Sequence, residues 1–146
     1  MPDTKFNLIA GSWTAGVSEI ENRNPSDITD LIGLFTQASA DQLEATLDRA
    51  RIAQADWAGY GLERKQAVLM AIGAELMSRA EELGTLLSRE EGKPLAEGRG
   101  EVYRAGQFFT YYAAETLRQL GENADSVRAG VEIDVRREPV GVVAVI

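Results

Sequence analysis

The densest group of potential acid, base and cation functions in the chain is the run Arg-Glu-Glu-Gly-Lys-Pro at residues 89–94. Carboxylates and lysine can act as general acids or bases, so this run is the first candidate for chemistry. Glu90 and Glu91, however, are adjacent in sequence, and adjacent residues on a helix point apart. The run is therefore more typical of a solvated helix end, where Lys93 favours the terminal carbonyl groups.

The chain contains no cysteine and no histidine among its 146 residues. Their absence excludes thiolate nucleophiles, imidazole bases, disulfides and the ordinary zinc ligand sets. A catalytic site made within this sequence would have to use carboxylates or lysine.

Two glycine-containing turns come nearest to a phosphate-binding loop, Gly59-Tyr60-Gly61 and Gly98-Arg99-Gly100. Neither follows a predicted strand, and neither completes a dinucleotide-binding or Walker pattern. They do not predict a nucleotide site.

Four aromatic residues lie close together on a predicted helix, Phe108, Phe109, Tyr111 and Tyr112. They could form a stacking platform, but Phe109 belongs to the apolar stripe of that helix and core packing is the better interpretation. Stacking on nucleic acid also needs a basic surround, whereas the chain has 15 Lys and Arg against 23 Asp and Glu and a formal charge of -8. We expect no nucleic-acid partner.

The overall composition is that of a globular domain, with 45% hydrophobic and 26% charged residues. The first residues have no cationic segment followed by an apolar one, and no apolar run reaches the roughly 18 residues of a membrane span. We expect a cytoplasmic protein without a signal peptide or a membrane contact.

The N-terminal region is predicted to be β-rich. Apolar runs at residues 6–10 and 17–20 suggest an early hairpin. Asn, Pro and Asp within residues 22–27 indicate a turn, after which residues 31–36 return as a strand.

Four amphipathic helices are predicted to follow. Ser39 with Gln42, and Ser78 with Glu81, fit capping boxes that would begin the first and third helices. Glycines are expected at the ends of the helices. The predicted spans are residues 39 to 59 or 61, 62 to about 80, 78 to 92, and 95 to 120.

The fourth predicted helix contains Gly98, Gly100 and Gly106. Each costs roughly 1 kcal/mol relative to alanine inside a helix. We expect the close approach of another backbone, or a ligand channel, to compensate, and packing is the favoured reason.

The C-terminal residues fall into three parts. Residues 121–130 lack periodicity and indicate a connection, while residues 131–136 alternate apolar and charged side chains and predict a half-exposed strand. The run after Pro139 is apolar throughout, as in a strand buried on both faces of a parallel α/β sheet. Ligands of such sheets bind beyond the carboxyl ends of the strands.

Several motifs, in their order and spacing, give the chain a resemblance to a known family. They are the Ile9-Ala10-Gly11-Ser12-Trp13 hairpin, Asn24-Pro25, Glu91-Gly92-Lys93-Pro94, Glu101-Val102 with Arg104, Tyr111-Tyr112-Ala113, and Arg137-Glu138-Pro139-Val140-Gly141-Val142-Val143. With these, nearly the whole chain resembles the amino-terminal third of an NAD(P)-dependent aldehyde dehydrogenase. The stretch at residues 96–102 resembles bacterial members that act on semialdehydes such as 2-oxoglutarate semialdehyde.

The resemblance implies an α/β fold with a β-hairpin, four helices, an oligomerisation strand and the first Rossmann-like strand. Residues 1–120 would be the N-terminal part of the cofactor-binding domain, residues 121–139 an oligomerisation arm, and residues 140–146 the truncated first strand of the Rossmann-like sheet.

The resemblance also implies two sites. Glu90, with backbone carbonyls near Asn22 and Arg23, would hold a structural monovalent cation. Gly100 and Arg104 would face a substrate tunnel, where the guanidinium could bind a substrate carboxylate bidentately. A surface or interhelix ion pair is the alternative role for Arg104.

The implied reaction is oxidation of a small aldehyde to a carboxylic acid with NAD or NADP through a cysteine thiohemiacetal. The catalytic residues and the cofactor contacts of the family lie later in its chain, so we expect residues 1–146 to be an inactive fragment that does not bind the cofactor itself. The full-length enzyme is expected to be a homo-dimer or homo-tetramer. The alternative is a non-enzymatic, acidic helical interaction module in which the four helices form a bundle.

Overall fold

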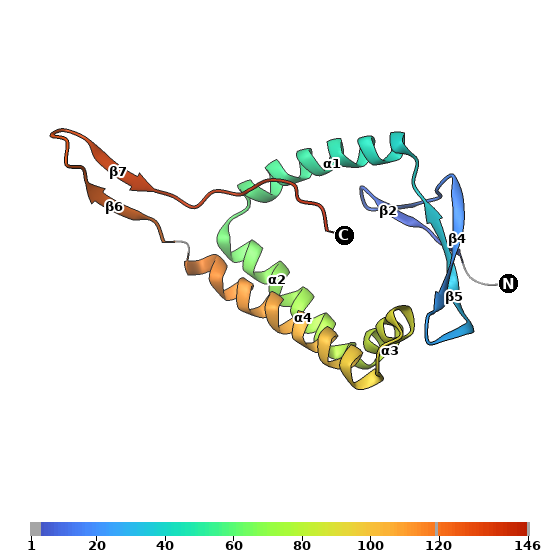
Figure 1. Cartoon of the computed structure of the whole chain (residues 1–146). Helices are drawn as coiled ribbons and strands as arrows, with labels where there is room; N and C mark the ends of the chain where they lie inside the picture. The colour runs from blue at the N-terminus through green and yellow to red at the C-terminus, as the bar shows by residue number, and fades with distance from the viewer. Residues whose placement is uncertain (1–3, 119, 146) are drawn as a thin grey trace.

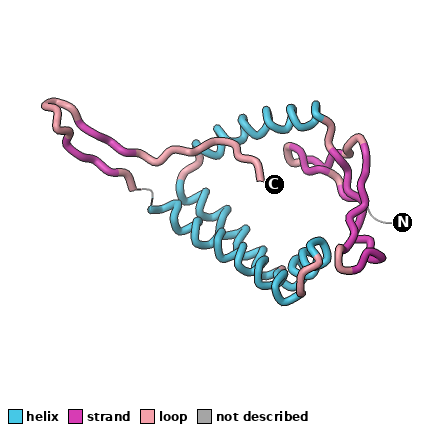
Figure 2. The backbone as a smooth tube through the Cα atoms, viewed as in Figure 1, coloured by secondary structure: helices cyan, strands magenta, loops and turns pink. Residues whose placement is uncertain are grey.

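The computed structural model describes residues 4–118 and 120–145. Strands lie at the N-terminal end, four helices follow, and a two-stranded hairpin extends away from the helices (Figures 1 and 2). The predicted α/β class is therefore confirmed. None of the described helices combines the length and the apolar content needed to cross a membrane.

The N-terminal strands form two separate sheets. In the larger sheet, β5 lies between β4, to which it is antiparallel, and β1, to which it is parallel. In the smaller sheet, β2 pairs antiparallel with β3. The bounds are β1 Thr4–Lys5, β2 Asn7–Ile9, β3 Ser12–Thr14, β4 Ser18–Asn24 and β5 Asp27–Gln37.

The early hairpin forms around residues 9–13, as the family resemblance implies, and not between the two apolar runs. Residues 7–9 pair with Ser12–Thr14 rather than with residues 17–20. The turn residues Ala10 and Gly11 have φ of 50° and 81°, and two consecutive positive φ values close a tight two-residue hairpin. The predicted turn before β5 is confirmed at Pro25 and Ser26.

The first two helices match their predictions. In α1 (Ala40–Gly59), the Gln42 backbone N–H donates to Ser39 Oγ at 3.1 Å and the Ser39 N–H donates to Gln42 Oε1 at 3.0 Å, which completes the capping box. Helix α2 (Leu62–Ser78) begins directly after Gly61.

The last two helices differ at their ends. Ser78 does not cap α3 (Ala80–Glu91), because its hydroxyl donates to the Glu75 carbonyl and Arg79 takes the N-cap position. Gly92 ends α3, as predicted, and it does so in the left-handed conformation. Helix α4 (Leu95–Glu115) stops short of residue 120 because the chain tightens into the 3-10 turn η1 (Thr116–Arg118).

Glycines bring the helix backbones into direct contact. A Cβ built on Gly73 would lie 2.8 Å from the Gly106 carbonyl oxygen, and one on Gly106 would lie 2.8 Å from that of Gly73. A Cβ on Gly98 would similarly lie 2.5 Å from the Gly84 carbonyl oxygen. Packing therefore explains Gly98 and Gly106, whereas a Cβ on Gly100 would have nothing within 4 Å.

Helix α4 is the common partner of α2 and α3, while α1 has no comparable neighbour among the described elements. Figure 1 shows α1 running apart from the α2–α4 pair. A bundle of four mutually packed helices, as the interaction-module alternative requires, is not formed.

The hairpin after η1 consists of β6 (Glu122–Asp125) and β7 (Glu132–Val135). The strand predicted for residues 131–136 is formed, but both of its faces are exposed rather than one. The absence of structure predicted for residues 121–130 is wrong, because the polar residues of β6 pair through their main chain and need no apolar pattern to do so.

The buried strand predicted after Pro139 is not formed in this structure. Residues 138–145 carry no strand, and Val140 and Val145 are 91% and 94% exposed. No described segment pairs with these residues, and the N–H and C=O groups of a strand need such a partner. Ile146 lies outside the described residues.

The fold exposes much more surface than is usual for its size. The accessible surface is 11078 Å², about half as much again as the roughly 7,400 Å² that the usual scaling gives for a 15.9 kDa monomer. Ala113 is the one buried hydrophobic residue in the described part of the chain. The elements are well defined, but their apolar faces are not gathered into one core.

The exposed apolar surface makes a prediction for the isolated 146-residue chain. We expect it to bind a hydrophobic dye and to lack a sharp, cooperative melting transition, because too little apolar area is buried to offset the conformational entropy of the chain. Dye fluorescence and calorimetry measure both properties. A cooperative melt of a monomer that binds no dye would contradict the prediction.

The glycine contacts make a second prediction, for the full-length protein. Gly106→Ala should lower the free energy of unfolding by about 1–3 kcal/mol, because the new methyl group would overlap the α2 backbone. Gly100→Ala is the matched control on the same helix and should be neutral or stabilising by up to about 1 kcal/mol. Equal effects in denaturant titrations would exclude backbone contact as the reason for Gly106.

Candidate functional site

The end of α3 lies against the turn between β4 and β5. Register shifts between Asn22 and Arg23 and between Arg23 and Asn24 interrupt the β4–β5 ladder at this point. The Ser26 hydroxyl donates to the Gly92 carbonyl at 2.8 Å, and a Cβ on Gly92 would lie 2.8 Å from Pro25 Cγ. Glycine at position 92 therefore allows both the left-handed end of α3 and the close approach of the turn between β4 and β5.

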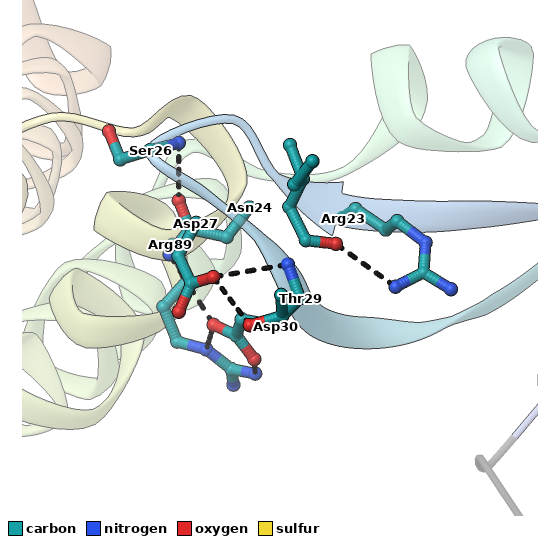
Figure 3. A network of polar contacts seen from close by, with 8 residues as sticks. Arg23, Asn24, Ser26, Asp27, Thr29, Asp30 and Arg89 are labelled. Atoms are coloured by element: carbon teal, nitrogen blue, oxygen red, sulfur yellow. Dashed lines mark hydrogen bonds and ion pairs between the residues drawn. The ribbon is translucent and has the colours of Figure 1, made fainter.

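A charged pair fixes this junction. Arg89 on α3 donates from Nε to Asp30 Oδ2 at 2.9 Å and from Nη2 to Asp30 Oδ1 at 2.6 Å (Figure 3). Asn24 Nδ2 is 3.4 Å from Asp30 Oδ2, and Asn24 Oδ1 accepts from the Ser26 N–H at 2.9 Å. The planar guanidinium and the carboxylate meet in the two-pronged geometry that gives such pairs their directionality.

The pair also shifts both pKa values. The hydrogen bond from Arg89 lowers the pKa of the Asp30 carboxyl below its usual value, and the hydrogen bond to Asp30 raises the pKa of Arg89. The pair is therefore fully charged at neutral pH. Its contribution to stability is present above the unfolded pKa of Asp30 and is lost as the pH falls through the lower folded value.

The three residues of the predicted cation site are partly brought together. Asn22 Nδ2 donates to Glu90 Oε1 at 3.2 Å, so β4 and α3 meet at this point. The Arg23 side chain is engaged elsewhere, by Glu21 Oε2 at 2.8 Å and the Ile28 carbonyl at 3.1 Å. Arg23 can therefore serve the site only through its main chain.

The composition of this site fits a monovalent cation better than a divalent one. Within residues 4–118 and 120–145, no three acidic side chains gather in a group that could hold a metal ion. Glu90 supplies one negative charge, and the strand irregularity at Asn22 and Arg23 is a place where carbonyls can turn out of the ladder. Divalent cations usually take more carboxylate ligands.

Lys93, the second positively charged side chain of residues 89–94, forms ion pairs with two nearby carboxylates. Lys93 Nζ lies 2.7 Å from Glu101 Oε2 and 2.5 Å from Glu91 Oε2. Its hydrogen bonds to Glu101 and then to Glu91 raise the pKa of Lys93. Lys93 ties the end of α3 to α4 and is not a free base. The run ends a helix, as predicted, but Lys93 pairs with carboxylates rather than with terminal carbonyl groups, and most of the run is part-buried rather than solvated.

The predicted tunnel residues lie one turn apart on α4. Gly100 borders open space, and Arg104 forms no ion pair in the described part of the chain, unlike Arg99, which pairs with Glu81 of α3. The alternative role predicted for Arg104, an interhelix ion pair, is thus not observed among these residues.

An aromatic groove continues from Arg104 along α4. A hollow of about 400 Å³ is lined by Arg104, Gln107, Phe108, Tyr111 and Tyr112. The two tyrosine rings meet edge to face with centroids 5.2 Å apart.

The core-packing interpretation of this aromatic group is wrong for three of its members. Phe108, Tyr111 and Tyr112 are 57–59% exposed, and only Phe109 is part-buried. The helix turns the first three away from α2, because α2 contacts the α4 face that carries Gly106 and Thr110.

Sequence reasoning missed Asp30 and Asn24 as members of the junction. Asp30 is an acidic residue within β5, directly before the apolar part of that strand, which is a signal of a specific partner. Its sequence separation of 59 positions from Arg89 hides the pairing, which only the tertiary structure reveals.

Comparison with known proteins shows which family has this sequence and fold. The model of the aldehyde dehydrogenase family matches residues 13–146. The α-ketoglutaric semialdehyde dehydrogenase of Bacillus subtilis is 32% identical over 99% of the chain and 30% of that protein. The NADP(+) succinate-semialdehyde dehydrogenase GabD of Escherichia coli is 29% identical over 95% of the chain and 29% of that protein.

Solved structures agree. The crystal structure of an aldehyde dehydrogenase from Brucella melitensis superimposes with a TM-score of 0.86 at 27% identity, over 95% of this chain and 29% of that one. The chain thus spans about 30% of the length of the curated relatives it matches. The family model covers nearly all of the chain and the structure has the same fold, so the chain belongs to the aldehyde dehydrogenase family.

Proposed function

We propose that the chain forms the amino-terminal part of an NAD(P)-dependent enzyme that oxidises an aldehyde to a carboxylic acid. The family match over residues 13–146 carries this proposal. The aldehyde and water would yield the acid, two electrons and a proton passing to the oxidised nicotinamide as a hydride, with a second proton released. The chain has no cysteine, so the thiohemiacetal would form on a part of the enzyme that this sequence does not contain.

The segments of the chain would then have distinct roles. Residues 1–120 would belong to the cofactor-binding domain and residues 121–139 would be the oligomerisation arm. Residues 140–146 would join the Rossmann-like sheet once neighbouring strands are present. NAD or NADP would be bound by the full-length enzyme in the cytoplasm, and we expect this chain alone to bind neither.

The open face of α4 suggests the substrate class. Arg104 offers a guanidinium without an ion-pair partner in the described residues, beside the groove of Phe108, Tyr111 and Tyr112. Such a groove suits a short aldehyde with a carboxylate at its far end, since Arg binds carboxylates bidentately. Both relatives described above are named for semialdehydes of dicarboxylic acids. We therefore propose 2-oxoglutarate semialdehyde or a similar carboxylated semialdehyde as substrate.

The role of Arg104 can be tested by kinetics of the full-length enzyme. Arg104→Met should raise KM for a carboxylated semialdehyde about 10- to 100-fold, from the loss of a charged hydrogen bond. It should leave KM for an uncharged aldehyde of similar length nearly unchanged. Arg118→Met, which removes an exposed arginine paired with Glu115, is the control and should affect neither. Equal effects on both substrates would contradict carboxylate recognition.

The β6–β7 hairpin suggests how subunits associate. Cross-strand partners share a face. One face therefore carries Ala124, Ile133 and Val135 together with Glu122, and the other carries Asn123, Asp125, Glu132 and Asp134. All eight strand residues are exposed. A ribbon with one mainly apolar face, charged only at Glu122, and one acidic face is suited to cover an apolar surface of a second subunit. We propose that the enzyme is a homo-dimer or homo-tetramer.

The two-faced hairpin makes a direct prediction. Ile133→Asp in the full-length enzyme should shift the assembly toward smaller species, because a charge would replace a side chain buried between subunits. Light scattering after gel filtration gives the mass. The control is Glu132→Gln on the opposite face, which should leave the mass unchanged, and an Ile133→Asp variant of wild-type mass would exclude this face as the contact.

A structural cation is the third part of the proposal. The Glu90 carboxylate and main-chain carbonyls at Asn22 and Arg23 would hold a monovalent ion between β4 and α3, on the basis of the 3.2 Å Asn22–Glu90 contact and the strand irregularity. Such an ion would reinforce the junction and would take no part in the chemistry.

A further inference from the structure

Two consecutive α3 residues of opposite charge face the same strand pair. Arg89 contacts Asp30 on β5, and Glu90 contacts Asn22 on β4. The hydrogen-bond partner of Glu90 among the described residues is thus a neutral amide. A free arginine near Glu90 would compete with a bound cation for the Glu90 carboxylate, because guanidinium–carboxylate hydrogen bonds are among the strongest in proteins.

Each cationic side chain within three residues of Glu90 or Asn22 in sequence is engaged by another acceptor. Arg89 is held by both oxygens of Asp30, Arg23 by Glu21 and the Ile28 carbonyl, and Lys93 by Glu91 and Glu101. None of the three is paired with Glu90. The negative charge of Glu90 is therefore left available at the irregular part of β4.

Asp30 is well placed to restrain Arg89. Both of its carboxylate oxygens accept from the guanidinium, and Asn24 donates to one of them from the strand turn (Figure 3). The Asp30 side chain is 29% exposed and that of Arg89 is 39% exposed, so water screens the pair incompletely. The acceptor is fixed on β5, three residues before Gly33, which is the β5 partner of Asn22.

We infer that Asp30 is a positioning residue for the cation site: it holds and neutralises Arg89, and so reserves the Glu90 carboxylate for a monovalent cation. The inference rests on the cation site proposed above. Without Asp30, Arg89, which directly precedes Glu90 on α3, would carry an uncompensated positive charge that repels the ion.

The test is a charge-balance series in the full-length protein. Asp30→Asn keeps the shape of the side chain but removes its charge, and should weaken binding of Na⁺ or K⁺ about tenfold or more. Asp30→Asn combined with Arg89→Met removes both charges and should restore most of the affinity. Glu90→Gln should abolish binding, while Glu82→Gln, which breaks the exposed Arg79–Glu82 pair on the same helix, should not change it.

Binding is measured without reference to activity. The rise in melting temperature with NaCl or KCl, relative to choline chloride at equal ionic strength, gives the apparent affinity, and ²³Na line broadening reports the bound ion directly. If the wild type responds to neither ion, the cation site and this inference both fail. If the wild type responds and Glu90→Gln does not, the site stands, and full binding by Asp30→Asn would overturn the inference.

The double variant distinguishes neutralisation of the Arg89 charge from a purely structural role of the Asp30–Arg89 pair. A purely structural Asp30–Arg89 pair predicts that removing both partners remains as harmful as removing one. Failure of the double variant to recover the cation response, while it still melts cooperatively, would also overturn the inference. Recovery of the response supports it.

Discussion

The arrangement of this chain depends on direct backbone contact between helices. At Gly73 with Gly106, and at Gly84 with Gly98, the helices approach so closely that a Cβ would meet a carbonyl oxygen at 2.5–2.8 Å. Glycine is unfavourable in a helix interior by roughly 1 kcal/mol. The close backbone packing at these positions offsets that cost. They fix α2 and α3 against α4, and thereby fix which face of α4 remains open.

The second organising contact is polar and joins helix to strand. The Asp30–Arg89 pair and the Asn22–Glu90 contact connect α3 to a β4–β5 unit that lies some 60 residues away in the chain. Partly exposed ion pairs contribute little net stability, but bidentate geometry restricts orientation strongly. The junction therefore orients backbone and carboxylate groups more than it stabilises the fold.

The same framework explains why the chain has well-formed elements and so little core. Its helices and strands have the fold of solved aldehyde dehydrogenases, and it matches about 30% of the length of its relatives. Apolar faces on α1, on the hairpin and after Pro139 are exposed. Within the proposed enzyme these faces would be covered, and this chain would act as scaffold, subunit contact and one wall of the substrate path.

The sequence alone determined the features that depend on local chemistry. Capping residues at Ser39, the left-handed glycine at Gly92 and the periodicity of the four helices are set by neighbours within a few residues, and all are found in the structure. The motif order also indicated the family that the comparisons established. The tertiary structure decided the rest, because it depends on partners far away in sequence. A strand after Pro139 needs a neighbour to pair with, the orientation of Tyr111 and Tyr112 depends on which side of α4 receives α2, and the pairing of Asp30 with Arg89 exists only once β5 and α3 are brought together.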